Sequence, residues 1–334
     1  CSSLNRQGFT MYSDDDLNLA VKNEIFTQAS VDDFRQSVSS LKNTPRVDEE
    51  NFRLIGGFND IFVVIACALL LFSSFFALKL INHSLSFFVL VALSWGLSEF
   101  FVLKKKMSLP AILLLIAFVG GIFAIISPFS TIAAAAASTI AAYVHWLRFK
   151  VPITIAAGTL AAIGVIISGI LSIFPSSKDW IFIILAGCGI ASFFLAMYWD
   201  SADITRTTRK SDVAFWLHLA SAPLIIHPIF SGLGVLDGNE SLITLFFVIV
   251  LYILMTLISI TIDRRAFMVS SLAYVLYALS TIIKTYGGVG YSFALTGVFM
   301  GAVLLLLSAF WHVARKYLVS KLPQKITTYI PKVA

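Results

Sequence analysis

Ten long apolar runs follow one another from Ile61 to about His312, and the basic residues fall almost entirely in every second gap between them. The runs are approximately 60–81, 85–103, 108–126, 129–147, 152–174, 180–199, 213–235, 241–262, 266–283 and 291–312. Each is close to the length of about 20 apolar residues that a helix needs to cross a bilayer. The pattern therefore predicts an all-α polytopic transmembrane bundle of about ten spans.

The basic gaps also predict the orientation of this bundle. They contain Arg46 and Arg53, Lys104 to Lys106, Arg148 and Lys150, Arg206 to Lys210, Arg264 and Arg265, and then Arg315, Lys316 and Lys321. The alternate gaps hold little beyond Lys79, Lys178 and Lys284. Short loops rich in Lys and Arg stay on the cytoplasmic side of a membrane. We therefore predict that both termini are cytoplasmic.

Composition supports a membrane solvent and points to lipid as the main partner. Of the 334 residues, 58% are hydrophobic and only 13% are charged, whereas soluble domains average about 25% charged residues. The formal charge is +6, but the basic residues form small clusters at span ends instead of one basic face. We expect the partners to be the lipid bilayer and its anionic head groups at the basic cytoplasmic loops, and we expect no nucleic acid.

Polarity divides the chain into three zones. These are a cytoplasmic N-terminal segment at 1–57, a transmembrane domain at 58–314 and a basic cytoplasmic tail at 315–334. The printed chain begins at Cys1, which we interpret as a truncated or mis-started chain, because a lipid-modified Cys1 would place the N-terminus outside, against the charge pattern.

The N-terminal segment contains one predicted amphipathic helix. Ser30 is placed to cap it, and Val31, Phe34, Val38 and Leu41 recur at helical spacing behind the cap. The resulting apolar face favours a helix that lies on the bilayer or on the bundle over one that binds a partner protein.

Acidic residues are scarce within the apolar runs. Glu99 is the deepest and lies about one turn before Lys104 to Lys106. An ion pair with those lysines at the interface is the plainer interpretation, and a proton or cation site is the alternative, since ionisable residues inside spans are costly and often functional. Asp263 falls at a span end, where we expect water to reach it.

A charged segment joins the sixth and seventh runs. Asp200, Asp203, Arg206, Arg209 and Asp212 recur at intervals of three. If the helix continued, opposite charges would be neighbours along one side, and the arginines would be able to bind a phosphate or a lipid head group. We favour the plainer interpretation, a cytoplasmic loop whose basic residues fix the topology.

Two histidines lie within the seventh run, His218 and His227, with Pro223 between them and Pro228 directly after. Their separation of nine residues corresponds to a rise of about 13–14 Å on a regular helix, so they cannot share one metal ion. A helix broken at Pro223 would present histidines at two depths to a proton-linked pathway. Equally, each histidine can be neutral and bonded to a neighbouring helix. We find no catalytic motif and predict no cofactor and no metal.

Small residues predict close helix packing at three places. Gly297 and Gly301 form a GxxxG pair, the run Ala133 to Ala137 offers a small face, and Ala161, Gly164 and Ser168 offer another. We favour packing within the bundle over a dimer interface. Small side chains let helix backbones approach where lipid supplies no hydrophobic drive.

Three stretches carry a resemblance to known sequences. They are IGGFNDIFVVIACALLL from Ile55, SWGLSEFFVLKKKMSLP from Ser94, and the segment from Asp200 to Pro228. In these stretches and in the order of its features, the chain resembles the uncharacterised bacterial multi-pass membrane proteins grouped as domains of unknown function. The resemblance implies a bacterial inner membrane and supplies no activity or site residues.

Three functional hypotheses follow. The leading one is a transporter or permease-like protein for a small solute, because ten spans divide into two sets of five with opposite orientation, as inverted-repeat carriers require. The second is a non-enzymatic membrane scaffold or sensor that contacts lipids or partners through its N-terminal helix and basic loops. The third, an enzyme acting on a phospholipid or polyprenyl substrate, would need residues 200–212 to form an interfacial pocket. The sequence does not predict an oligomeric state.

Overall fold

We analysed a computed structural model of the chain. It describes residues 14–41, 58–204, 206, 208–234, 242–287, 292–323, 327 and 329–331. This part of the chain is helical and contains no β-strand. The chain divides into a small unit at 1–48 and a large unit at 49–333, which we describe separately. Arg46 and Arg53, the first predicted basic gap, lie outside the described residues.

The small unit contains α1 (Asp14–Lys22) and α2 (Gln28–Leu41), the latter at the predicted amphipathic helix. The predicted cap is wrong by three residues, because the Thr27 Oγ1 accepts the backbone N–H of Ser30 at 3.1 Å and Ser30 lies inside the helix. A cap side chain accepts from the N2 or N3 amide, and Ser30 is at N3. Val31 is buried, whereas Phe34 is 56% exposed, so the apolar face is only partly covered within this unit.

The large unit is a series of long helices that coincide with the predicted runs. They are α3 (Phe58–Lys79), α4 (His83–Ser98) with its π-helical continuation η1 (Glu99–Lys104), α5 (Ser108–Ile126), α6 (Thr131–Phe149), α7 (Ile153–Ile173), the 3₁₀ turn η2 (Pro175–Trp180), α8 (Ile181–Ser201), α9 (Arg209–Gly232), α10 (Leu242–Ile262), α11 (Ala266–Gly287), α12 (Ser292–Ala309) and α13 (Trp311–Ser320).

Seven helices within the described residues are long and apolar enough to cross a membrane. The number rises to eight if α12 and α13, which meet at a bend of 66°, are taken as one broken span. The helix α6 is not among the seven, and the described part of α11 is a shorter apolar helix. The predicted all-helical fold is confirmed and suits a membrane protein. The count of ten spans stays a prediction.

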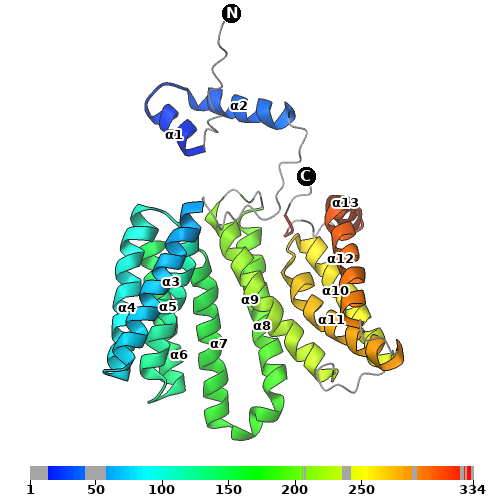
Figure 1. Ribbon diagram of the computed structural model, residues 1–334. Coiled ribbons are helices and arrows are strands. Elements are labelled where there is room, and N and C mark those ends of the chain that lie inside the picture. Colours follow the sequence, from blue (N-terminus) through cyan, green and yellow to red (C-terminus); the bar gives the residue numbers. More distant parts are fainter. Residues whose placement is uncertain are drawn as a thin grey trace, which may run out of the picture. The chain divides into compact units, whose positions relative to one another are not determined.

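The large unit is assembled from sequential antiparallel hairpins (Figure 1). Most extensive contacts join helices that follow one another, and α7 also packs on α9. Asn82 and Ser130 cap α4 and α6 at one end, where their side chains accept the amides of Leu85 and Ala133. The other end carries the connections 105–107, 150–152, 202–208 and 263–265, which hold the basic residues. We call it the basic end.

The small residues of α6 and α7 lie against each other, whereas the GxxxG pair of α12 meets no neighbour among the described residues. A Cβ added to Gly164 of α7 would lie 3.5 Å from Ala135 of α6, so two of the small faces named from the sequence pack together. A Cβ added to Gly297 or Gly301 would meet no atom within 4 Å among the described residues, so close packing at that pair stays a prediction. The helix α12 instead buries Thr296 and Met300.

Candidate functional site

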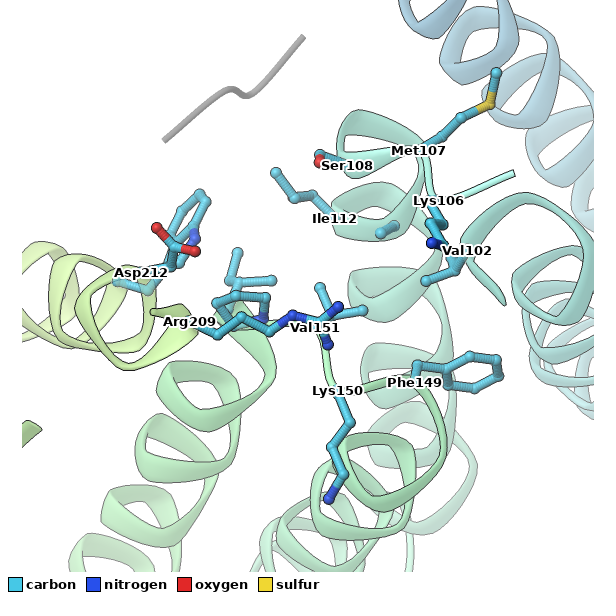
Figure 2. Close-up of a pocket in the computed structure, with 14 residues that line it drawn as sticks. Val102, Lys106, Met107, Ser108, Ile112, Phe149, Lys150, Val151, Arg209 and Asp212 are labelled. Carbon is cyan, nitrogen blue, oxygen red and sulfur yellow. The ribbon is translucent and has the colours of Figure 1, made fainter. Parts of the chain in front are cut away.

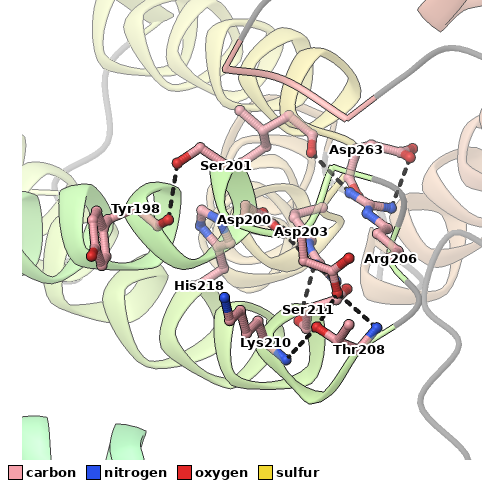
Figure 3. Close-up of polar contacts among 12 residues, drawn as sticks. Tyr198, Asp200, Ser201, Asp203, Arg206, Thr208, Lys210, Ser211, His218 and Asp263 are labelled. Atoms are coloured by element: carbon pink, nitrogen blue, oxygen red, sulfur yellow. Dashed lines mark hydrogen bonds and ion pairs between the residues drawn. The ribbon is translucent and has the colours of Figure 1, made fainter.

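Three ionisable side chains meet deep in the basic end of the large unit (Figure 3). Asp200, in the last turn of α8, accepts from Arg264 Nη2 at 2.6 Å through Oδ1 and from Arg264 Nε at 3.3 Å through Oδ2. His218 Nε2 of α9 lies 3.1 Å from the same Oδ2. All three side chains are at most 2% exposed. We call Asp200, His218 and Arg264 the buried triad.

Two members of the buried triad, Asp200 and Arg264, are brought together by the positions of helix ends. The helix α8 ends at Ser201, and Arg264 lies in the tight connection between α10 and α11, so both charges lie at the same end of adjacent hairpins. Arg264 Nη2 also reaches the backbone carbonyl and the hydroxyl of Ser211, each at 3.1 Å, in the first turn of α9. The planar guanidinium therefore ties three helices together through charge-assisted hydrogen bonds.

A second group of contacts surrounds Asp263, which has a left-handed backbone with φ 58°. Its carboxylate accepts from Arg206 Nη1 at 2.9 Å and from Trp311 Nε1 at 2.9 Å. Arg315 of α13 lies 3.5 Å from it and donates to the Pro331 carbonyl at 2.6 Å. Asp263 is 2% exposed, so our expectation that water reaches it is wrong. The C-terminal segment is thereby connected to the α8–α9 loop.

Arg206 stays charged in this setting. Burial is the main cause that lowers the pKa of its guanidinium, and the neighbouring charge of Arg264 lowers that pKa as well, while Asp263 opposes both. Arginine is not deprotonated in proteins, so Arg206 faces Asp263 as a cation.

The residues spaced by three between α8 and α9 do not continue a helix. Asp203 accepts the backbone N–H and the hydroxyl of Thr208 at 2.8 and 2.6 Å and so closes the connection between the two helices. Arg206 has φ 54° and turns toward Asp263. Asp203 and Arg206 therefore lie in a connection, as the favoured interpretation expects, whereas Asp200 belongs to α8 and Arg209 and Asp212 belong to α9. The role of the basic residues in topology stays a prediction. Asp200, Asp203 and Arg206 are mostly buried.

The two histidines of α9 have separate partners. His227 Nδ1 lies 2.6 Å from the Tyr274 hydroxyl of α11, while His218 belongs to the buried triad. The helix α9 continues through Pro223, whose side chain is exposed, so of the two alternatives the structure shows histidines bonded to neighbouring helices and no break at Pro223. Transmembrane helices tolerate proline where the freed backbone group is otherwise satisfied.

Glu99 pairs with an arginine and not with the predicted lysines. Arg148 of α6 donates through Nε and Nη2 to its two carboxylate oxygens at 2.9 and 2.8 Å. The side chains of Arg148 and Glu99 are 55% and 34% exposed. The interfacial ion pair is therefore present, with a partner 49 residues away in place of Lys104 to Lys106.

A pocket of about 340 Å³ opens at the basic end (Figure 2). Its walls come from η1, from the starts of α5, α7 and α9, and from the connection between α6 and α7. Its charged lining residues are Lys106, Lys150, Arg209 and Asp212, and Trp216 forms part of the wall. We call it the basic-end pocket.

The backbone around the basic-end pocket presents helix N-termini. Met107 and Pro152, which precede α5 and α7, make no side-chain cap hydrogen bond, whereas Thr208 caps α9. Lys106 and Lys150 have φ values of 54° and 53°. The left-handed turns stop the preceding helices and start the next ones at the pocket wall. Amide groups at such starts, together with the helix dipoles, favour anions.

Of the eight candidate residues predicted from sequence, the structure unites Asp200 with His218 and places Arg209 in the pocket. Reasoning from the sequence missed Arg264 and Trp311 because their partners are distant in sequence. The adjacent Asp263 and Arg264 after an apolar run were the available signal. Within the described residues, no group of three or more His, Cys, Asp or Glu side chains is placed to hold a metal ion.

Comparisons with family models, with curated proteins and with solved structures give no match to this chain. The resemblance to uncharacterised bacterial membrane proteins therefore stays an expectation, and the functional argument depends on the geometry of the basic end.

Proposed function

We propose that the chain is an integral multi-pass membrane protein of the permease type, and that the basic-end pocket is its binding site for a small solute. The observation that carries the proposal is the pocket itself, which has about 340 Å³ of space and charged groups on its wall. Ligand sites in proteins typically have volumes of about 300–1,000 Å³ and a few convergent polar groups.

Connectivity supports a full set of ten spans. The helix α6 has 19 residues, equivalent to about 28 Å, and packs against both α5 and α7, which are candidate spans. It also joins the far end of α5 to the start of α7 through short connections. A helix in that position has to cross the same layer as its neighbours. Alanine, His145 and Arg148 lower its hydropathy without changing its path.

We place the basic end in the cytoplasm of a bacterial inner membrane, with both termini on that side. The support is the distribution of Lys and Arg, since short cytoplasmic loops carry the excess of these residues. With ten spans, the bundle divides into two sets of five of opposite orientation, the arrangement used by inverted-repeat carriers. The basic-end pocket would then face the cytoplasm.

Solute flux into proteoliposomes tests the proposal. We expect uptake of at least one member of a panel of small anions, and we expect Arg209→Gln to reduce it. Lys210→Gln is the matched control, because Lys210 is exposed, follows Arg209 directly and does not line the pocket. Equal losses in the two variants, or no flux of any solute across the panel, would contradict the permease proposal.

A scaffold or sensor is the second candidate, and the small unit favours it. Leu19, Ile25, Phe26 and Phe34 are 49–67% exposed on this charged helix pair, which suits contact with lipid or a protein. Deletion of residues 14–41 should then abolish recovery of a partner or binding to vesicles while leaving the large unit folded. Unchanged recovery and unchanged vesicle binding would remove this candidate.

A further inference from the structure

We infer that the basic-end pocket binds a phosphate group carried on a molecule with an apolar organic part. The inference deepens the proposed function, since it assumes that this pocket is the ligand site and names the chemical class of the ligand. The same chemistry occurs in a soluble phosphate ester and in a phospholipid head group, and the experiment below separates these two sources.

Side-chain charge is the first reason. Lys106, Arg209 and Asp212 line the basic-end pocket and give a net charge of +1. Lys150 also lines it, but its ammonium lies 5.3 Å from the centre of the Trp146 ring, which is not part of the wall, and Figure 2 shows this side chain extending away from Lys106 and Arg209. A phosphate monoester is an anion at neutral pH, so the sign of its charge is opposite to that of the lining.

Arg209 differs from three other arginines at the basic end. Arg148, Arg206 and Arg264 each have a carboxylate partner at 2.6–2.9 Å. Within the described residues, neither Arg209 nor Lys106 makes a hydrogen bond or ion pair with a side chain. An arginine in this state presents its planar fork to a phosphate, for which bidentate contact is geometrically suited.

The helix starts add backbone donors to these cations. The helices α4 and α6, which begin at the opposite end, are capped by Asn82 and Ser130, whereas α5 and α7 begin at the pocket without side-chain caps. Amides in the first turn of a helix lack intrahelical acceptors, and phosphate oxygens are common partners for them. At the start of α7, however, the amides of Thr154 and Ile155 already donate to the carbonyls of Val151 and Pro152, and Pro110 in the first turn of α5 has no N–H, so only the few remaining first-turn amides add to the positive lining.

The remaining wall indicates what the phosphate is attached to. Apolar side chains of Val102, Ala111, Ile112, Phe149 and Ile153 complete the lining together with Trp216. The volume exceeds what a single inorganic phosphate would fill, since pockets of this size hold small organic ligands. Asp212 can accept a hydrogen bond from a hydroxyl on such a ligand. The pocket therefore fits an ester better than the free ion.

Calorimetric titration with phenyl phosphate tests this inference. The full chain is purified in a maltoside detergent, which contains no phosphate, and titrated with phenyl phosphate and with neutral benzyl alcohol. We expect binding of phenyl phosphate only. Arg209→Gln and Lys106→Gln should each weaken it about tenfold or more, the usual size for loss of a charge-assisted hydrogen bond. Lys210→Gln and Lys105→Gln should leave it unchanged.

A second arm identifies the source of the phosphate. If the natural ligand is a lipid head group, phosphatidic acid added to the micelles should displace phenyl phosphate. If phosphatidic acid does not displace phenyl phosphate, the natural ligand is a soluble phosphate ester. Absence of phenyl phosphate binding, or equal weakening by the control variants, would overturn the inference. Binding of phenyl phosphate without solute flux into proteoliposomes would refute the permease proposal and leave this inference standing. Flux of an uncharged solute without binding of phenyl phosphate would refute this inference and leave the permease proposal standing.

Discussion

Two arginine–carboxylate pairs in this molecule are both bidentate, but one is buried and the other is exposed. Arg264 contacts both oxygens of Asp200 in a site that is at most 2% exposed, and Arg148 contacts both oxygens of Glu99 with side chains 55% and 34% exposed. Each pair joins helices that are distant in sequence. The two pairs use the same kinds of donor and acceptor and differ in burial and in the further contacts that the buried pair makes with His218 and Ser211.

Burial decides what each pair contributes to the fold. A buried pair gains little net stability, because desolvation offsets attraction, but loss of one partner leaves an uncompensated charge. An exposed pair is hydrated before and after it forms, and salt screens it. We therefore infer that the buried triad fixes how α8, α9 and the α10–α11 connection pack together. The Glu99 pair is an interfacial contact that contributes little to the free energy of unfolding.

The largest predicted effect comes from breaking the buried pair on one side. Arg264→Met should lower the free energy of unfolding by about 3–5 kcal/mol, because Asp200 would remain buried without its cation. Urea titration in detergent micelles, followed by circular dichroism, measures this loss. A change no larger than that of an exposed substitution would contradict our account of the triad.

The double variant Asp200→Leu with Arg264→Met sharpens the same comparison. It removes both charges, so we expect it to recover more than half of the single-variant loss, with the unpaired His218 accounting for the remainder. A double variant less stable than Arg264→Met would show that the pair itself is strongly stabilising.

The second effect concerns the contacts around Asp263. Asp263→Asn removes the charge that Arg206 faces, and we expect a loss of about 1.5–3 kcal/mol in the free energy of unfolding, the range for hydrogen bonds to charged groups. Asp179→Asn is the control, because Asp179 is an exposed acid near the opposite end. The same urea titration applies, and equal midpoints for the two variants would count against a buried role for Asp263.

The third effect is smaller because it concerns a single hydrogen bond between two helices. Tyr274→Phe removes the hydroxyl that lies 2.6 Å from His227 Nδ1, and we expect a loss of about 0.6 kcal/mol, the average for hydrogen bonds between membrane helices. Tyr277→Phe, in the same helix and 40% exposed, is the matched control. Thermal unfolding in micelles measures the difference between them, which should vanish if the His227 contact contributes nothing.

The smallest effect belongs to the exposed pair. Arg148→Gln should leave the unfolding midpoint unchanged at physiological salt and should lower it slightly at low ionic strength, where screening is weaker. Unfolding midpoints measured across a salt series test this. A large loss that does not depend on salt would mean that exposure is not what separates the two pairs.

Helix positions were predictable from this sequence, whereas the meeting of side chains was not. Apolar runs of span length locate helices because lipid solvation acts on every residue of a segment. Asp200 and Arg264 are 64 residues apart, and no local period relates them. Arg209 was a candidate from its charged segment. Lys150 was interpreted only as a marker of topology, and Lys106 as such a marker and as a possible partner of Glu99, because a pocket depends on where three loops converge.

Four charged residues at the basic end, Lys106, Lys150, Arg206 and Asp263, keep left-handed backbones with φ of 53–58°. Such a conformation costs an L-residue about 1 kcal/mol or more, and glycine avoids most of it. Glycine in place of Lys106 or Lys150 would make the protein easier to handle by raising its melting temperature, and it would also erase two charges at this end. Glycine in place of Arg206 or Asp263 would in addition break the buried contact between these two side chains. Substitutions chosen only for stability would thus remove charged side chains at the basic end. A stabilised variant chosen for structural work should keep these four side chains.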